Sequence, residues 1–309
     1  MTARTPQLPP VVQRAAARAT PFLLPIWFIV GSLHKLITFW TEDLIAIDYW
    51  IYREAGLLAL SGGDPWTASY NGFRFAAPPP TVIPYAGLAL LPDMVGLAVS
   101  VVVLVAAAVV TIRVLRLPWY WLFFPPLFES LLAQNADILI VALLVMGPGW
   151  GALAPMFKVY GGIPLVFQKR WREAFLAGVL CLVSLPLVPT YLAQFGELSR
   201  VLEEQASGGF SVWGSLFMIP TVIALWVLGR VRAGWMIVPA IWPSTQPHYS
   251  CLAIPVVRES RMLAAIVSIP IPGAAAAGCV YYALVLTWRQ RRAARAARSS
   301  VIAPESSLG

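Results

Sequence analysis

Charged residues are scarce in this sequence. Only 12% of its 309 residues are Asp, Glu, Lys or Arg, whereas 59% are hydrophobic, and the mean hydropathy is +0.74. A soluble domain carries about 25% charged residues. The charged residues of this chain are too few to cover a water-facing surface. The composition therefore excludes a soluble protein and indicates an integral membrane protein.

Cysteine and close acidic pairs are also rare, which bears on cofactors. Cys181, Cys251 and Cys279 lie in apolar sequence without a Cys-x-x-Cys spacing, and this favours buried thiols over metal or redox roles. Asp43 and Asp48 are too far apart in sequence to form a close acidic pair, which argues against a metal. No glycine-rich loop opens a helix after a strand, so no nucleotide site is predicted. We expect neither a metal nor a cofactor.

The net charge of +8 is concentrated at the two ends of the chain. Residues 1–18 contain three arginines and no acid, and residues 289–309 contain five arginines and one glutamate, so the ends hold seven of the eight net charges. Lys and Arg stay on the cytoplasmic side during membrane insertion. We interpret 1–18 as a basic cytoplasmic tail, 19–288 as a transmembrane body and 289–309 as a basic flexible tail. Membrane lipids, and not nucleic acid, are the partners that this distribution favours.

Apolar segments recur along the body. A spanning helix needs about 20 mostly apolar residues, and shorter segments broken by Pro or Gly must be buried in protein or line a cavity. The sequence therefore predicts an all-α, polytopic transmembrane bundle with a cavity and about nine to eleven spans. The clear segments are 20–40, 94–113, 172–191, 211–229 and 262–288, and the broken ones are 78–91, 118–133, 136–147, 149–167, 233–243 and 247–257.

The positive-inside rule also predicts which loops face outward. Two basic clusters inside the body fit the cytoplasmic side, which leaves the net acidic loops 41–77 and 192–210 on the outer side. Near the C-terminus the charge pattern leaves two alternatives open. Either 247–257 does not cross the membrane, or the last span is folded at Pro270-Ile271-Pro272-Gly273.

Residues 48–60, in the first outer loop, predict an amphipathic helix that lies along the membrane surface. The segment is too short and too charged to span, and it ends at the turn sequence Ser61-Gly62-Gly63-Asp64-Pro65. Asp48 and Tyr52 are four residues apart and therefore share one face of this helix. We interpret that face as a candidate wall of a substrate site. An acidic residue at a helix start is also commonly an N-cap, so both roles stay open for Asp48.

An ordered series of short motifs begins in this loop. It comprises Asp48-x-x-x-Tyr52-x-x-Ala55, Ser61-Gly62-Gly63-Asp64-Pro65-Trp66, Phe73-Arg74-Phe75, Pro78-Pro79-Pro80, Pro84, Leu91-Pro92, Gln134-Asn135, a small-residue segment 151–158 that ends in Lys158, the basic turn 169–172, and Pro243-Ser244-Thr245-Gln246-Pro247-His248-Tyr249. The series resembles glycosyltransferase family 87. This chain is shorter than is usual for the family and differs from its pattern at Ala133, Gly161 and Gln246, as a divergent member would.

The resemblance implies a GT-C-like membrane enzyme of the polyprenyl-phosphate-dependent class. Such an enzyme moves a mannose- or pentose-like sugar from a polyprenyl phosphate to a glycan or glycolipid acceptor on the extracytoplasmic face of the cell membrane. It needs no nucleotide-linked donor. The reaction needs a carboxylate that takes the acceptor proton and cations that hold the leaving phosphate. The resemblance makes Asp48 the candidate base in an inverting displacement. It assigns Lys158, His248 and Tyr249 to the donor phosphate, and Tyr52, Arg74, Gln134 and Asn135 to the substrate wall.

Several of these residues have structural alternatives. A lone lysine in a membrane segment is a functional candidate because it is costly to bury, but Lys158 can also snorkel from a helix end. Glu129 and Asp137 are expected to pair with Lys158 or with Arg113 and Arg116.

Other residues and other functions also stay open. Gln134 and Asn135 can satisfy broken backbone, and His34 is expected to be structural. Two further functions are a transporter or flippase of a lipid-linked or anionic substrate, and an inactive lipid-binding homologue.

Overall fold

The computed structural model describes residues 10–205 and 209–302, and this part of the chain is almost entirely helical. Its one sheet is a two-stranded antiparallel hairpin of β1 (Ser69–Tyr70) and β2 (Phe73–Arg74), with Tyr70 opposite Phe73. The all-α prediction is confirmed. The α-helices are α1 (Pro10–Thr41), α2 (Ile47–Leu60), α3 (Pro79–Ala89), α4 (Asp93–Val114), α5 (Pro125–Ala133), α6 (Asp137–Val145), α7 (Ala154–Phe157), α8 (Gly162–Phe167), α9 (Trp171–Cys181), α10 (Val188–Gln205), α11 (Met218–Leu228), α12 (Arg230–Ile241), α13 (Ile254–Val257), α14 (Arg261–Val267) and α15 (Ala274–Ile302). The 3₁₀ helices are η1 (Pro65–Thr67), η2 (Trp119–Phe123), η3 (Trp150–Leu153), η4 (Val159–Gly161), η5 (Leu182–Leu187) and η6 (Pro247–Ala253).

Three helices within the described ranges are long and apolar enough to cross a membrane. They are Pro21–Thr41 of α1, Asp93–Val114, and the continuous helix Trp171–Leu202 that joins α9, η5 and α10. The pair α5 and α6, bent by 116°, makes a fourth if it counts as one span. The protein is thus a membrane protein, as its composition predicts. Prolines and glycines divide the other apolar segments into shorter pieces, so nine to eleven crossings stays a prediction.

The expected segment 262–288 is broken. Helix α14 ends at Val267 and α15 begins at Ala274, and Gly273 between them has a φ of 80°. The helix is interrupted at Pro270–Gly273 because the prolines there cannot continue a helical hydrogen-bond ladder. Both alternatives for how the C-terminal region crosses the membrane stay predictions.

Three other segments differ from the predictions. Within 211–229 the α-helix begins only at Met218, and most of the expected outer loop 192–210 is helical, because α10 continues to Gln205. The expected flexible tail 289–309 is helical as far as Ile302, since Ala and Arg are strong helix formers. Residues 1–9 and 303–309 of the two predicted tails lie outside the described residues.

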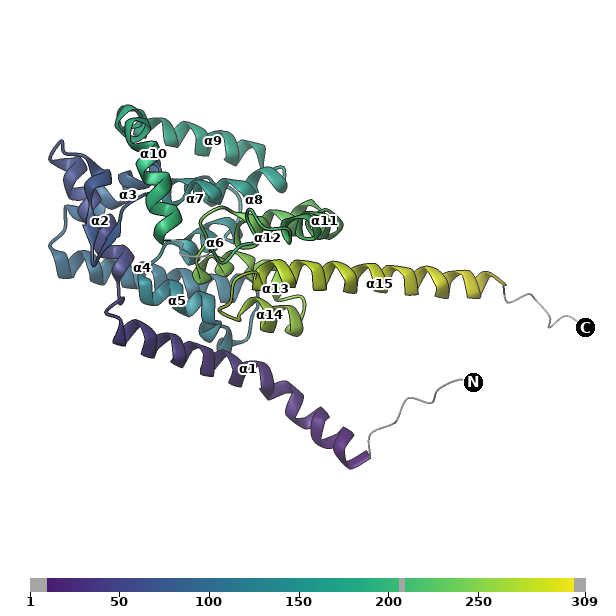
Figure 1. Ribbon diagram of the computed structural model, residues 1–309. Helices are drawn as coiled ribbons and strands as arrows, with labels where there is room; N and C mark the ends of the chain where they lie inside the picture. Colours follow the sequence, from purple (N-terminus) through teal and green to yellow (C-terminus); the bar gives the residue numbers. More distant parts are fainter. Residues whose placement is uncertain (1–9, 206–208, 303–309) are drawn as a thin grey trace, which may run out of the picture.

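The two basic ends extend in the same direction. Figure 1 shows that the N-terminal part of α1 and the C-terminal part of α15 both project beyond the body on the side opposite α2. The first part of α15 packs against α11, α12 and α14. Two ends that point the same way agree with a common membrane side for both, which is what the positive-inside interpretation requires.

A small second core fixes the loop 41–77. It contains Phe39, Ile47, Ile51, Ala55, Trp66, Ala68, Phe75, Val82, Ala133 and Leu198, and so joins α1, α2, η1, α3, α5 and α10. Helices α2 and α3 approach so closely that a Cβ at Gly56 would lie 2.6 Å from the carbonyl oxygen of Tyr85. This packing holds α2, and with it Asp48, against the rest of the molecule.

Candidate functional site

A cavity of about 250 Å³ lies beside the start of α2. It brings together seven of the eight residues that the sequence analysis selects, from segments far apart in the chain. Those seven are Asp48, Tyr52, Arg74, Asn135, Lys158, His248 and Tyr249, and Phe75, Tyr160, Tyr191, Trp242 and Gln246 also line the cavity.

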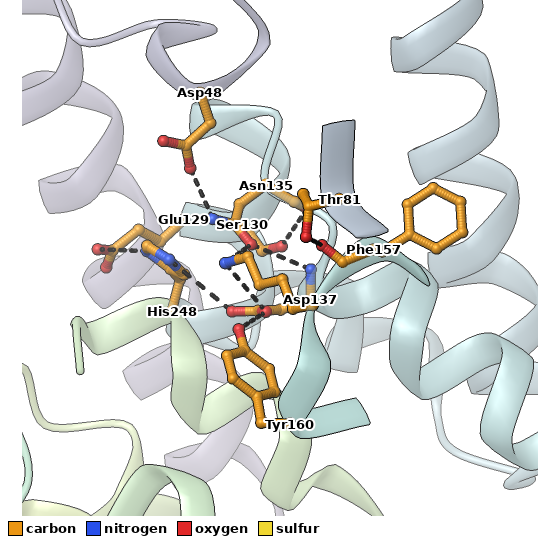
Figure 2. Close-up of polar contacts among 10 residues, drawn as sticks. Asp48, Thr81, Glu129, Ser130, Asn135, Asp137, Phe157, Tyr160 and His248 are labelled. Atoms are coloured by element: carbon orange, nitrogen blue, oxygen red, sulfur yellow. Dashed lines mark hydrogen bonds and ion pairs between the residues drawn. The ribbon is translucent and has the colours of Figure 1, made fainter. Parts of the chain in front are cut away.

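Asp48 lies in the first turn of α2 and points into this cavity. The helix is preceded by Ala46, which has a φ of 58° and makes no side-chain cap, so the N-cap alternative for Asp48 is wrong. Instead, Asp48 Oδ2 accepts a hydrogen bond of 2.6 Å from Asn135 Nδ2 (Figure 2). Among the described residues no donor bonds its Oδ1. One carboxylate oxygen is thus held in place while the other is available to a substrate.

The sharp turn between α5 and α6 places Asn135. Gln134 has a φ of 59° and ends α5, while its side chain donates to Leu131 O and accepts from Ser100. Gln134 therefore satisfies local groups and does not line the cavity, contrary to the substrate-wall assignment. The Asn135 side chain caps α6 by accepting from the Asp137 N–H at 3.1 Å.

Lys158 lies between α7 and η4, where the backbone is extended and the chain changes direction. Its Nζ lies 2.9 Å from Asn135 Oδ1 and 3.4 Å from Asp137 Oδ1, and the residue is 6% exposed. The lysine is therefore buried and paired with Asp137, and does not snorkel to a helix end. The close return of the chain requires Gly161, because a Cβ there would lie 2.9 Å from the carbonyl group of Ala154.

His248 lies on η6 between two buried carboxylates (Figure 2). Its Nδ1 is 3.8 Å from Glu129 Oε1, and its Nε2 is 3.8 Å from Asp137 Oδ2. Glu129 also pairs with Lys35 of α1, at 2.6 Å between Nζ and Oε2, and not with Arg113 or Arg116 as the sequence allowed.

Two polar residues of the site were missed from the sequence. The Tyr160 hydroxyl donates to Asp137 (Figure 2), although nothing in its local sequence distinguishes it from an interfacial tyrosine. Lys35 does carry a signal, because it is a lone lysine in a spanning segment, although a lysine near a helix end can also snorkel. His34 itself is exposed.

Aromatic rings form the outer wall of the cavity. The Tyr52 ring packs 4.6 Å from that of Tyr85 and 5.2 Å from that of Phe75, measured between centroids. Burial, and then the nearby Asp48 carboxylate, raise the pKa of Tyr52 well above its ordinary value. Its hydroxyl consequently stays protonated and acts as a hydrogen-bond donor beside the base. On the opposite side, Lys158 Nζ lies 4.6 Å from the centroid of the Tyr249 ring.

Arg74 joins the outer hairpin to α10. Its Nε donates to Trp66 O at 2.7 Å, and its guanidinium contacts Glu197 and Gln194. Arg74 thus lines the cavity while it fastens α10 to the hairpin.

A larger cavity of about 1270 Å³ adjoins the first one. The two share Leu202 and Ser244 in their linings. The larger one is mainly apolar and lies along α11 and α15, with Val212, Trp213, Phe217, Ala277, Val280 and Leu284 among its lining residues. Segments broken by Pro and Gly, among them those at Pro243 and Pro272, line this space, as the sequence analysis predicts for such segments.

The combined arrangement suits a substrate with three parts. The Asp48 carboxylate can accept a proton from a hydroxyl, the Lys158 ammonium can pair with an anion, and the adjoining apolar cavity can take a hydrocarbon chain. Comparison with protein families, curated proteins and solved structures finds no match to this chain. The geometry of the two cavities therefore carries the functional argument.

Proposed function

We propose that this protein is a polytopic, GT-C-like membrane glycosyltransferase. It transfers a mannose- or pentose-like sugar from a polyprenyl-phosphate donor to a glycan or glycolipid acceptor on the extracytoplasmic face of the cell membrane. The motif series that resembles glycosyltransferase family 87 supports this proposal, because its residues converge on the cavity although they are distant in sequence.

One observation carries the proposal. A single amide, that of Asn135, links a carboxylate to a buried cation: its Nδ2 bonds Asp48 at 2.6 Å and its Oδ1 bonds Lys158 at 2.9 Å. A base and a phosphate-binding cation are thus linked through one amide at one cavity. Transfer of a sugar from a phosphate to a hydroxyl needs both groups at one site, since the acceptor and the leaving phosphate flank one anomeric carbon.

The chemistry then follows from the positions of the groups. Asp48 takes the proton of the acceptor hydroxyl while the oxygen of that hydroxyl forms a bond to the anomeric carbon. The bond from that carbon to the phosphate oxygen breaks in the same displacement, with inversion. The polyprenyl phosphate leaves with its charge stabilised by Lys158 and His248. The protonated phenol of Tyr52 is placed to hydrogen-bond a sugar or acceptor hydroxyl near the base.

The adjoining cavity supports a lipid-linked donor over a soluble one. An apolar space of about 1270 Å³ next to a polar cavity of about 250 Å³ matches a long hydrocarbon chain attached to a small charged and hydroxylated head. Its walls include exposed apolar residues of α11 and α15, such as Phe217 and Leu284. A chain in that cavity places its phosphate toward Ser244, where the two cavities meet.

The decisive experiment supplies the purified protein with a panel of polyprenyl-phosphate sugars and candidate acceptors. Mass spectrometry then measures donor consumption and glycosylated product. We expect Asp48→Asn to lower transfer by roughly a hundredfold to ten-thousandfold, while the protein still inserts and elutes as the wild type does. Asp43→Asn is the matched control, because Asp43 is an exposed acid in the same loop, and it should retain full transfer.

Other results would point elsewhere. Full transfer by Asp48→Asn removes the proposed base. Movement of a lipid-linked or anionic substrate across proteoliposomes without any product favours the transporter or flippase. Donor binding without turnover, in the presence of every acceptor class, favours the inactive lipid-binding homologue.

A further inference from the structure

A buried ion pair lies beside His248. Lys35 of α1 and Glu129 of α5 are 2.6 Å apart, with side-chain exposures of 13% and 6%. Helices α1 and α5 pack directly against each other. Neither residue lines the cavity of about 250 Å³ that His248 lines, so neither contacts a substrate there.

Glu129 divides its two carboxylate oxygens between two partners. Oε2 faces Lys35 Nζ, and Oε1 faces His248 Nδ1 at 3.8 Å (Figure 2). The lysine thus fixes the carboxylate, and the carboxylate in turn faces one edge of the imidazole. A carboxylate that faces one ring nitrogen sets the orientation of a histidine and the nitrogen that carries hydrogen.

The other edge of the imidazole is the one presented to the site. Nε2 is buried and has no hydrogen-bond partner among the described residues, although Asp137 Oδ2 lies 3.8 Å away. The Tyr160 hydroxyl and Lys158 Nζ both contact Asp137 Oδ1, so Asp137 Oδ2 is likewise without a hydrogen-bond partner among the described residues. Nε2 and Oδ2 thus face each other on the ring edge opposite Glu129, and His248 lines the cavity together with Lys158.

We propose that Glu129, held by Lys35, is a positioning residue that fixes the orientation of the His248 imidazole beside the leaving phosphate. This inference rests on the proposed glycosyl transfer for its consequence, but the contact on which it depends can be measured without any turnover. The titratable and charged groups that face the imidazole are Glu129 from α5 and Asp137 from α6, and the Tyr249 ring packs 4.9 Å from it.

The test uses the fact that the sequence contains only two histidines. Protein without a histidine tag, labelled with ¹⁵N-histidine in detergent micelles, gives signals from His34 and His248 alone, and His34→Asn assigns them. We expect Glu129→Gln and Lys35→Met each to change the imidazole ¹⁵N shifts of His248. Glu129→Asp should preserve them in part, and Glu54→Gln, which alters an exposed acid of α2, should leave them unchanged.

Steady-state kinetics on the same variants supply the second arm. Glu129→Gln and Lys35→Met should lower kcat by about tenfold or more with a smaller change in KM, since the contact acts on the leaving group and not on donor binding as a whole. Glu129→Asp should recover part of the loss. A merely structural pair would instead lower the yield of folded protein and leave both the His248 signals and the kcat of the folded fraction unchanged.

The two proposals fail separately. Unchanged His248 signals in both Glu129→Gln and Lys35→Met overturn the positioning role even if transfer is observed. Absence of transfer by the wild type with every donor overturns the proposed function, and the imidazole signals still decide whether Glu129 orients His248. If Glu129→Gln does not fold, Lys35→Met and Glu129→Asp give the same discrimination.

Discussion

The buried pair of Lys158 and Asp137 gives the sharpest prediction about how the site is built. Nζ and Oδ1 are 3.4 Å apart, and the side-chain exposures are 7% and 0%. At an effective dielectric constant of 20, unit charges at this distance attract by about 5 kcal/mol. Removal of one partner leaves the other charge buried, which costs about 3–5 kcal/mol. We expect Lys158→Met and Asp137→Asn each to lower the free energy of unfolding by about 3 kcal/mol or more.

The double substitution separates this pair from its surroundings. Because Lys158→Met with Asp137→Asn leaves no unpaired charge from the pair, it should cost less than the sum of the single substitutions, by about 3 kcal/mol. The free energy is measured from denaturant unfolding in a mild detergent, followed by the fluorescence of the 13 tryptophans.

An ion pair with one exposed partner is the matched control. Arg53 and Asp93 are 2.5 Å apart, but the Asp93 side chain is 63% exposed. The coupling between Arg53→Met and Asp93→Asn should therefore be about 1 kcal/mol or less. Additive single substitutions at Lys158 and Asp137, or equal coupling in the two pairs, would refute the reasoning that burial makes the Lys158 contact strong.

Three further substitutions probe the parts that surround the base. Asn135→Ala removes the bonds to Asp48 and Lys158, so transfer should fall at least tenfold, and a wild-type rate would show that Asp48 needs no such support. Gly56→Ala puts a Cβ 2.6 Å from Tyr85 O, and thermal denaturation should show a loss of roughly 1–3 kcal/mol. Ala277→Trp fills the apolar cavity and should raise KM for long-chain donors more than for short-chain ones, whereas Ala293→Trp, farther along α15, should affect neither; equal KM ratios would remove that cavity from donor binding.

Local sequence was enough to predict the helix that carries Asp48. The apolar spacing, the charged first turn and the glycine stop predicted residues 48–60, and α2 runs from Ile47 to Leu60. Each of these signals acts within one or two turns of chain. The turn role of Asp64 is of the same kind, and its side chain accepts from the Trp66 N–H at 3.0 Å. Such features follow from backbone propensities and need no knowledge of tertiary packing.

Partners in the buried network could not be predicted in the same way. The sequence showed that Lys158, Glu129 and Asp137 were isolated charges in apolar segments, and it therefore required that they find partners. The structure confirms Lys158 as the partner of Asp137, but Glu129 pairs with Lys35, which was not among the partners that the sequence offered. That choice depends on how α1 and α5 lie against each other, which local pattern does not encode.

The correction at Gln134 has the same origin. Its polarity and its neighbour Asn135 made both residues candidates for the substrate wall, but a left-handed residue at the end of α5 turns the two side chains in different directions. Gln134 then hydrogen-bonds Ser100 and Leu131, whereas Asn135 lies at the cavity and hydrogen-bonds Asp48. A sequence motif can thus identify the pair, while the dihedral angle of one residue decides which member faces the site.

The scarcity of charge that identifies a membrane protein also explains where its charges lie. Every buried charge costs free energy in an apolar body, so a chain with few ionisable residues keeps them buried only where each has a partner. Here Lys35, Glu129, His248, Asp137 and Lys158 form one continuous series of neighbours, each within 4 Å of the next. The two lysines and the two carboxylates of this series lie next to opposite charges, and Lys158 at its end lines the cavity. The buried network is therefore the part of the molecule where the proposed donor phosphate would meet a cation without crossing an apolar wall.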